Sequence, residues 1–205
     1  MPTVEQTINQ QFARTLTADD WHLFKRMAEF YLRLAVFLKK KDIELDVNSE
    51  SLRLLTRNCL KRLYIGIGVE LVLKAAYLKH GYQINKLENR QSNAPPFPFT
   101  FQQAQGFRVS ANKTYMLDDL IKKISSVLPG GADGLLVGFR IAKVFRNKEG
   151  HTVFQKQRFD PSNYREIEAS LVTLYERAFR EKLQVRFAVA KGERGLWKKS
   201  CKNPH

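Results

Sequence analysis

Apolar residues recur with helical spacing over most of this chain, in stretches separated by turn-forming residues. The first stretch runs from about Asp19 to Lys41, with Thr17 as its N-cap and Asp20 as the capping-box residue. The second runs from about Ser49 to His80 and stops at Gly81. The pattern therefore predicts two long helices in the first 81 residues.

The middle of the second predicted helix, Leu63 to Leu78, is apolar on all sides apart from Glu70 and Lys74. This composition predicts a central, buried helix. A buried carboxylate needs a partner. Lys74, four residues further on, is the local candidate, and Arg146 or Arg140 from another helix is the long-range one.

A long insertion, residues 82–113, separates the second helix from the third. Its part from Asn89 to Thr100 contains three prolines in four positions and is incompatible with a helix. A connection of this length in a compact domain is usually functional or mobile. Its aromatic residues are expected to form either a short strand pair or a small apolar lid; they are Phe97, Phe99, Phe101 and Phe107.

Helical patterns resume after the insertion. Three further helices are predicted: Tyr115 to Pro129, Ala132 to Glu149, and one that begins at Pro161, with Asp160 as its N-cap, and runs to about Lys191. The predicted fold is all-α, an antiparallel bundle of about five helices with a Pro/Phe-rich insertion between the second and third. Residues 1–191 are expected to form a single domain, followed by a basic tail, 192–205.

The formal net charge of +15 indicates a polyanionic partner, either nucleic acid or an acidic protein. The segment from Arg177 to His205 contains nine Lys or Arg residues and two Glu residues, which gives it a net charge of +7. Lys198 and Lys199 are candidate phosphate contacts, and Trp197 is a candidate for stacking on bases. A purely solubilising tail is the alternative.

Several functional classes find no support in the sequence. No apolar run reaches membrane-spanning length, and the N-terminus lacks the form of a signal peptide. The two distant cysteines, Cys59 and Cys201, indicate a reducing cytoplasm. No cluster has metal-ligand spacing, so neither a metal nor another cofactor is expected. Gly66-Ile67-Gly68 lies within a helix and is not a nucleotide-binding loop, and His22 and His80 are expected to be structural.

The candidate chemistry lies at the end of the fourth predicted helix, in the sequence Arg146-Asn147-Lys148-Glu149-Gly150-His151. Arg146 lies within about 40° of Leu135, Phe139 and Ala142 on a helical wheel and so continues an apolar stripe. On an unbroken helix His151 would point about 140° away from it. Gly150 is expected to end the helix and turn the histidine back beside the arginine. The alternative is a pair that caps a helix C-terminus.

With these residues the chain resembles the HEPN family, whose signature is Arg-x(4–6)-His, often with Asn after the Arg. The stretch from Gly68 to Leu78, followed by Gly81-Tyr82, resembles the family's long central helix, and Tyr115 to Ile121 resembles the start of its next helix. The resemblance extends from about Ser49 to Phe187.

The resemblance implies a metal-independent endoribonuclease of the toxin or phage-defence type, active as a homodimer with a composite site. His151 would act as the acid or base and Arg146 would stabilise the phosphorane, while Asn147 would orient the phosphate or the histidine. The products would be a 2′,3′-cyclic phosphate and a 5′-hydroxyl. Arg140, Lys143 and Lys148 are further candidate RNA contacts. A regulatory antitoxin is possible, although Val153 stands where toxins silenced by adenylylation carry a tyrosine.

Two alternatives remain open from the sequence. One is a non-catalytic HEPN module that dimerises and binds RNA or a partner protein. The other, less favoured, is a helical DNA-binding protein, although no helix-turn-helix is evident.

Overall fold

The computed structural model describes residues 2–40, 50–88, 92–151 and 160–186. These residues are largely helical, with one small two-stranded sheet, in agreement with the predicted largely helical class. The elements in chain order are α1 (Val4–Phe12), α2 (Trp21–Lys40), α3 (Glu50–Lys79), β1 (Asn85–Leu87), β2 (Val109–Thr114), α4 (Leu117–Lys123), α5 (Leu136–His151) and α6 (Pro161–Leu174).

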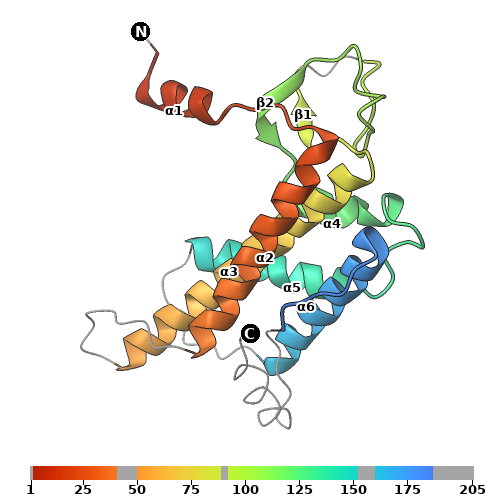
Figure 1. The fold of residues 1–205 in the computed structure, drawn as a ribbon. Coiled ribbons are helices and arrows are strands. Elements are labelled where there is room, and N and C mark those ends of the chain that lie inside the picture. The colour runs from red at the N-terminus through yellow and green to blue at the C-terminus, as the bar shows by residue number, and fades with distance from the viewer. Residues whose placement is uncertain (1, 41–49, 89–91, 152–159, 187–205) are drawn as a thin grey trace, which may run out of the picture.

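The two long helices α2 and α3 run antiparallel along each other (Figure 1). On α2 the buried residues Ala28, Leu32 and Ala35 recur at spacings of three and four and form one face. Gly68 of α3 permits the close approach, since a Cβ there would lie 2.8 Å from Leu32 Cγ. The predicted burial of the central helix is confirmed, because Val69, Val72 and most residues from there to Leu78 are fully buried.

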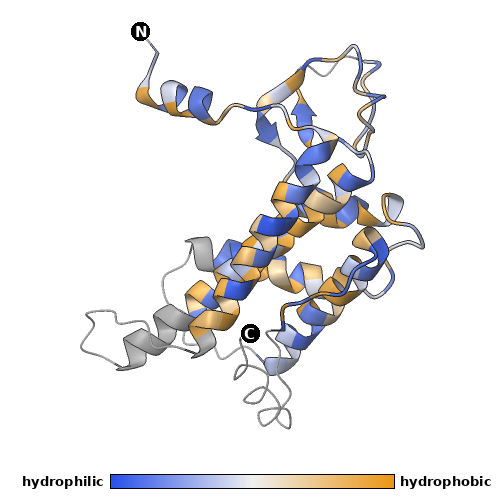
Figure 2. Cartoon of the chain, in the orientation of Figure 1, coloured by the Kyte–Doolittle hydropathy of each residue, from blue (hydrophilic) through white to orange (hydrophobic). Residues whose placement is uncertain are grey.

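Helices α5 and α6 complete the core on the other side of α3. Figure 2 shows hydrophobic residues along α3 and α5 where these helices cross. Phe139, Ala142 and Phe145 of α5 are buried there, and Leu171 and Leu174 of α6 are fully buried. The predicted start of α6 is confirmed: Asp160 accepts a hydrogen bond from the Ser162 N–H at 2.8 Å, and proline occupies the first turn.

The insertion contains the small sheet, formed by the antiparallel strands β1 and β2. Its aromatic residues lie outside these strands, so the strand pair that we expected from them is built by other residues. Phe99 is fully buried, and Phe97 stacks on Tyr115 with ring centroids 3.8 Å apart. The aromatic residues therefore anchor the insertion against the helical core.

Several predicted helix boundaries are wrong. The third predicted helix, Tyr115 to Pro129, is shortened to α4 followed by a 3₁₀ turn, Ile124–Ser126. The fifth does not reach Lys191: α6 passes into a π-helical turn, Tyr175–Phe179, and stops at Arg180, which has a left-handed conformation with φ of 56°. Beyond it, buried Leu183 and Val185 alternate with exposed residues, a period of two that belongs to extended chain.

Helix α1 was not predicted. Its N-cap is Thr3, whose side chain accepts a hydrogen bond from the Gln6 N–H at 3.1 Å while Gln6 Oε1 accepts one from the Thr3 N–H at 2.8 Å. This reciprocal pair was the available sequence signal. In the described part of the chain, no helix is long and apolar enough to cross a membrane.

Candidate functional site

Helix α5 carries the motif and is held between α3 and α6 by two close approaches of the backbone. At Gly66 of α3, a Cβ would lie 2.6 Å from Arg146 Cβ. At Gly138 of α5, a Cβ would lie 2.3 Å from the Glu166 carbonyl oxygen of α6. Such distances exclude a side chain at either position without movement of the helices. The two glycines therefore fix where Arg146 lies.

The central observation is the ion pair that we expected at Glu70. Arg146 Nε lies 2.6 Å from Glu70 Oε2, and Lys74 Nζ lies 2.9 Å from Glu70 Oε1. The local and the long-range candidate partners are both present, one on each carboxylate oxygen. Glu70 is 8% exposed, so its charge is compensated within the core. Arg140, the other proposed partner, is exposed.

Residues Gly66, Glu70 and Lys74 lie four apart on one face of α3 and together form the seat of Arg146. Gly66 provides the space and Glu70 the countercharge. Lys74 also donates a hydrogen bond to Thr114 Oγ1 at 3.1 Å, which connects this seat to strand β2. The sequence analysis missed the role of Gly66, although its i, i+4 spacing from Glu70 was visible in the sequence.

The predicted turn at Gly150 is wrong. Helix α5 continues through Gly150 to His151, so the chain does not bend back there. On a continuous helix, positions 146 and 151 are separated by about 140° around the axis. The backbone therefore does not bring these two positions onto one face. The His151 side chain lies outside the described residues.

The remaining proposed site residues are distributed as follows. Asn147 and Lys148 are exposed on the last turns of α5. Lys143 forms an ion pair with Asp118 of α4, with Nζ 2.5 Å from Oδ1. Hydrogen bonds from Lys122 and Lys143 lower the pKa of the Asp118 carboxyl to about 2. Trp197, Lys198 and Lys199 lie outside the described residues.

A guanidinium that is held at Nε by a carboxylate has a fixed plane. The Arg146 side chain is 32% exposed, and an arginine carries five N–H donors, so this group is suited to hold an anion such as a phosphate. His80, just after the end of α3, is remote from it, because His80 follows Glu70 by ten residues, about 15 Å along the helix.

The described residues include no group of three or more His, Cys, Asp or Glu side chains arranged to hold a metal ion. Comparisons of the chain with protein-family models, with curated proteins and with solved structures give no match. The resemblance to HEPN domains therefore rests on the residues quoted above.

Proposed function

We propose that the protein is a metal-independent endoribonuclease of the HEPN type, with its helices arranged as an antiparallel bundle around α3. The observation that supports this proposal is the seat of Arg146. A cation fixed by Glu70 and Gly66, partly open to solvent and next to the exposed Asn147, is the kind of preorganised group that stabilises a phosphorane.

In the proposed reaction, the 2′-hydroxyl oxygen of the RNA attacks the adjacent phosphorus while the bond from phosphorus to the 5′-oxygen breaks. His151 takes the hydroxyl proton while water protonates the leaving 5′-oxygen, or His151 protonates the 5′-oxygen while water takes the hydroxyl proton. Arg146 compensates the charge on the non-bridging oxygens, and Asn147 orients the phosphate. The products are a 2′,3′-cyclic phosphate and a 5′-hydroxyl.

The continuous helix α5 adds a condition to this proposal. On this backbone, positions 146 and 151 of one chain are about 140° apart around α5. We propose that Arg146 of one copy acts with His151 of a second copy in a two-fold dimer.

The direct test is incubation of the full-length protein with RNA in the presence of a chelator, followed by analysis of the fragment ends. Cleavage should persist with chelator and fall by a factor of about 10²–10⁴ in His151→Ala, since the proton-transfer group is lost. Arg108→Ala, which removes an exposed arginine from the β2 end of the insertion, is the matched control and should keep wild-type cleavage. Cleavage that requires a divalent ion would contradict the proposal.

Arg146→Ala should abolish cleavage and also destabilise the fold. We expect a loss of about 1–3 kcal/mol in the free energy of unfolding, less than for a fully buried pair, because Lys74 remains beside Glu70. Arg146→Lys keeps the charge and should recover part of this stability without recovering cleavage. Denaturant titrations and cleavage assays on the same samples separate the two roles.

The shared site has its own test. Mixing Arg146→Ala with His151→Ala chains creates dimers in which one of two sites has both groups intact, so cleavage should reappear in the mixture. A site contained within a single chain would stay inactive in every mixture.

The second candidate is a non-catalytic module that binds RNA or a partner protein. It is favoured by the same separation of positions 146 and 151 around α5, and by the ion pair of Arg146 with Glu70. RNA binding that is retained in His151→Ala, without cleavage by the wild-type protein, would support this alternative.

A further inference from the structure

Helix α1 exposes an apolar stripe. None of its nine residues is buried, and its hydrophobic residues Val4, Ile8 and Phe12 are 76%, 48% and 81% exposed. Their spacing of four places them on one side of the helix. A helix of this length is marginal in water when it packs on nothing. A second surface over this stripe would therefore stabilise α1.

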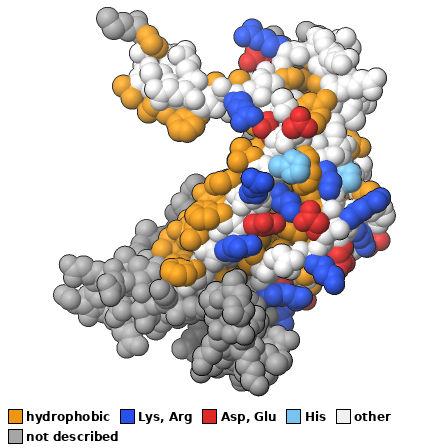
Figure 3. Space-filling view, viewed as in Figure 1, with side chains coloured by type: hydrophobic (Ala, Val, Ile, Leu, Met, Phe, Trp, Pro, Cys, Tyr) orange, Lys and Arg blue, Asp and Glu red, His pale blue; other side chains and the backbone are white. Residues whose placement is uncertain are grey.

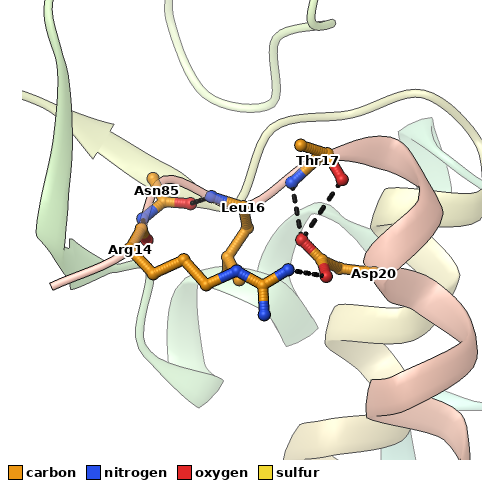
Figure 4. A network of polar contacts seen from close by, with 5 residues as sticks. All are labelled: Arg14, Leu16, Thr17, Asp20 and Asn85. Carbon is orange, nitrogen blue, oxygen red and sulfur yellow. Dashed lines mark hydrogen bonds and ion pairs between the residues drawn. The ribbon is translucent and has the colours of Figure 1, made fainter. Parts of the chain in front are cut away.

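The segment after α1 is bonded to the small sheet and to the start of α2. The Arg14 N–H donates to the Ala111 carbonyl at 2.9 Å, and the Leu16 N–H donates to Asn85 Oδ1 at 3.2 Å. The Arg14 guanidinium also pairs with Asp20 at the start of α2 (Figure 4). The segment is thereby fixed to the hairpin, and α1 projects outward from it (Figure 1).

Helix α2 has an apolar face in addition to the one that packs on α3. Leu23, Met27, Phe30 and Leu34 follow spacings of four, three and four, which is the heptad pattern of a helix-pairing seam. Leu23, Met27 and Phe30 are 51%, 39% and 53% exposed. Figure 3 shows the resulting band of hydrophobic side chains along α2, with Lys and Arg side chains beside it. We call these four residues the α2 seam.

The stripe and the seam match in length and charge. From Val4 to Phe12 the stripe spans about 12 Å, and from Leu23 to Leu34 the seam spans about 16 Å. Exposed Arg26 and Arg33 border the seam, so pairing of two α2 helices along it would bring like charges together. Helix α1 has a single charged residue, Glu5, beside its stripe, and its opposite charge suits these arginines.

We propose that α1 of one copy docks on the α2 seam of a second copy, and that the exchange is reciprocal. Two identical contacts related by a two-fold axis then cover the stripe and the seam of both copies. The buried area is twice that of a single contact between α1 and the α2 seam. This contact uses α1 and α2 and does not depend on the proposed ribonuclease activity of α5.

The test is cross-linking between differently tagged full-length chains in a background in which Cys59 and Cys201 are replaced by serine. One chain carries Ile8→Cys and the other Met27→Cys, both at the centres of their surfaces. A short bismaleimide should join them into a covalent heterodimer. Gln10→Cys, exposed on the opposite side of α1, is the matched control and should give at least tenfold less product with the same partner.

Phe30→Asp in the Met27→Cys chain should abolish the cross-link. Because Phe30 is half exposed, this variant should keep the wild-type circular dichroism melt, which verifies that it is folded. If Phe30→Asp unfolds the chain, Leu23→Asp is substituted. Equal cross-linking through Gln10→Cys, or no cross-linking through Ile8→Cys, would overturn the proposal. Cleavage assays on the same variants keep this outcome separate from that of the ribonuclease proposal.

Discussion

At the scale of single residues, two polar groups on or next to α3 differ in whether their buried atoms have polar partners. Glu70 is compensated twice, by Arg146 and by Lys74. His80, at the end of the same helix, has a buried Nε2 atom without a hydrogen-bond partner among the described residues. Burial lowers the pKa of His80, and the neighbouring charge of Lys79 lowers it further, while a hydrogen bond with the Ala178 backbone opposes both. The histidine is therefore held in its neutral form.

This arrangement predicts a pH-dependent stability. The pKa of His80 in the folded chain is below its unfolded value of about 6.5, so the unfolded chain binds the proton more readily as pH falls. The free energy of unfolding should decrease from pH 7.5 to pH 5, and His80→Gln should reduce this decrease. Denaturant titrations at the two pH values measure it. Asp118, with a pKa of about 2, stays ionised throughout this range. An equal decrease in both proteins would contradict the assignment.

At the scale of elements, the glycines within helices determine how closely the helices approach. An alanine in a helix is favoured over glycine by about 1 kcal/mol, so Gly→Ala stabilises wherever there is room. At Gly138 the obstacle is the Glu166 backbone oxygen, 2.3 Å from the position of a Cβ. At Gly68 the nearest atoms belong to the Leu32 side chain, at 2.8 Å and 2.9 Å.

Gly138→Ala should therefore lower the free energy of unfolding by about 3 kcal/mol or more, because backbone of α6 must shift. Gly68→Ala should lower it by about 1–2 kcal/mol, since a side chain yields more easily. Thermal and denaturant melts of the two variants give the order. A smaller loss at Gly138 than at Gly68 would contradict the helix contact described for α5.

The same scale explains how far sequence alone could go. The long helices α2 and α3, the capping residues Thr17 and Asp160, and the ion pair of Glu70 with Lys74 follow from local patterns. The long-range partner Arg146 followed from its place on the apolar stripe of α5. The end of α5 could not be predicted from the local pattern, because a glycine only permits a turn, and here the helix continues through Gly150. The end of α6 also depends on a non-glycine residue, Arg180, in a left-handed conformation that no spacing indicates.

At the scale of the whole molecule, the net charge of +15 governs association with polyanions. The segment 192–205 carries four basic residues, Arg194, Lys198, Lys199 and Lys202. If these residues contact RNA phosphates, each contact releases counterions and steepens the dependence of affinity on salt.

Deletion of residues 192–205 should weaken the binding of single-stranded RNA and reduce the slope of log affinity against log salt concentration by about 3. Fluorescence anisotropy at several salt concentrations measures both quantities. Replacement of the four basic residues by glutamine in the full-length chain should reproduce the effect, which separates charge from chain length. An unchanged slope would assign the segment a role other than phosphate binding.

The two contacts that hold α5 determine which substitutions the protein can accept under selection. Gly66 and Gly138 have no chemistry of their own, yet each determines where a neighbouring helix can lie. Asn147 is exposed and lies outside the core. A population of variants selected only for folded protein would retain the two glycines and drift at Asn147. A population selected for RNA cleavage would retain all three, so the pattern of accepted substitutions would separate architecture from activity.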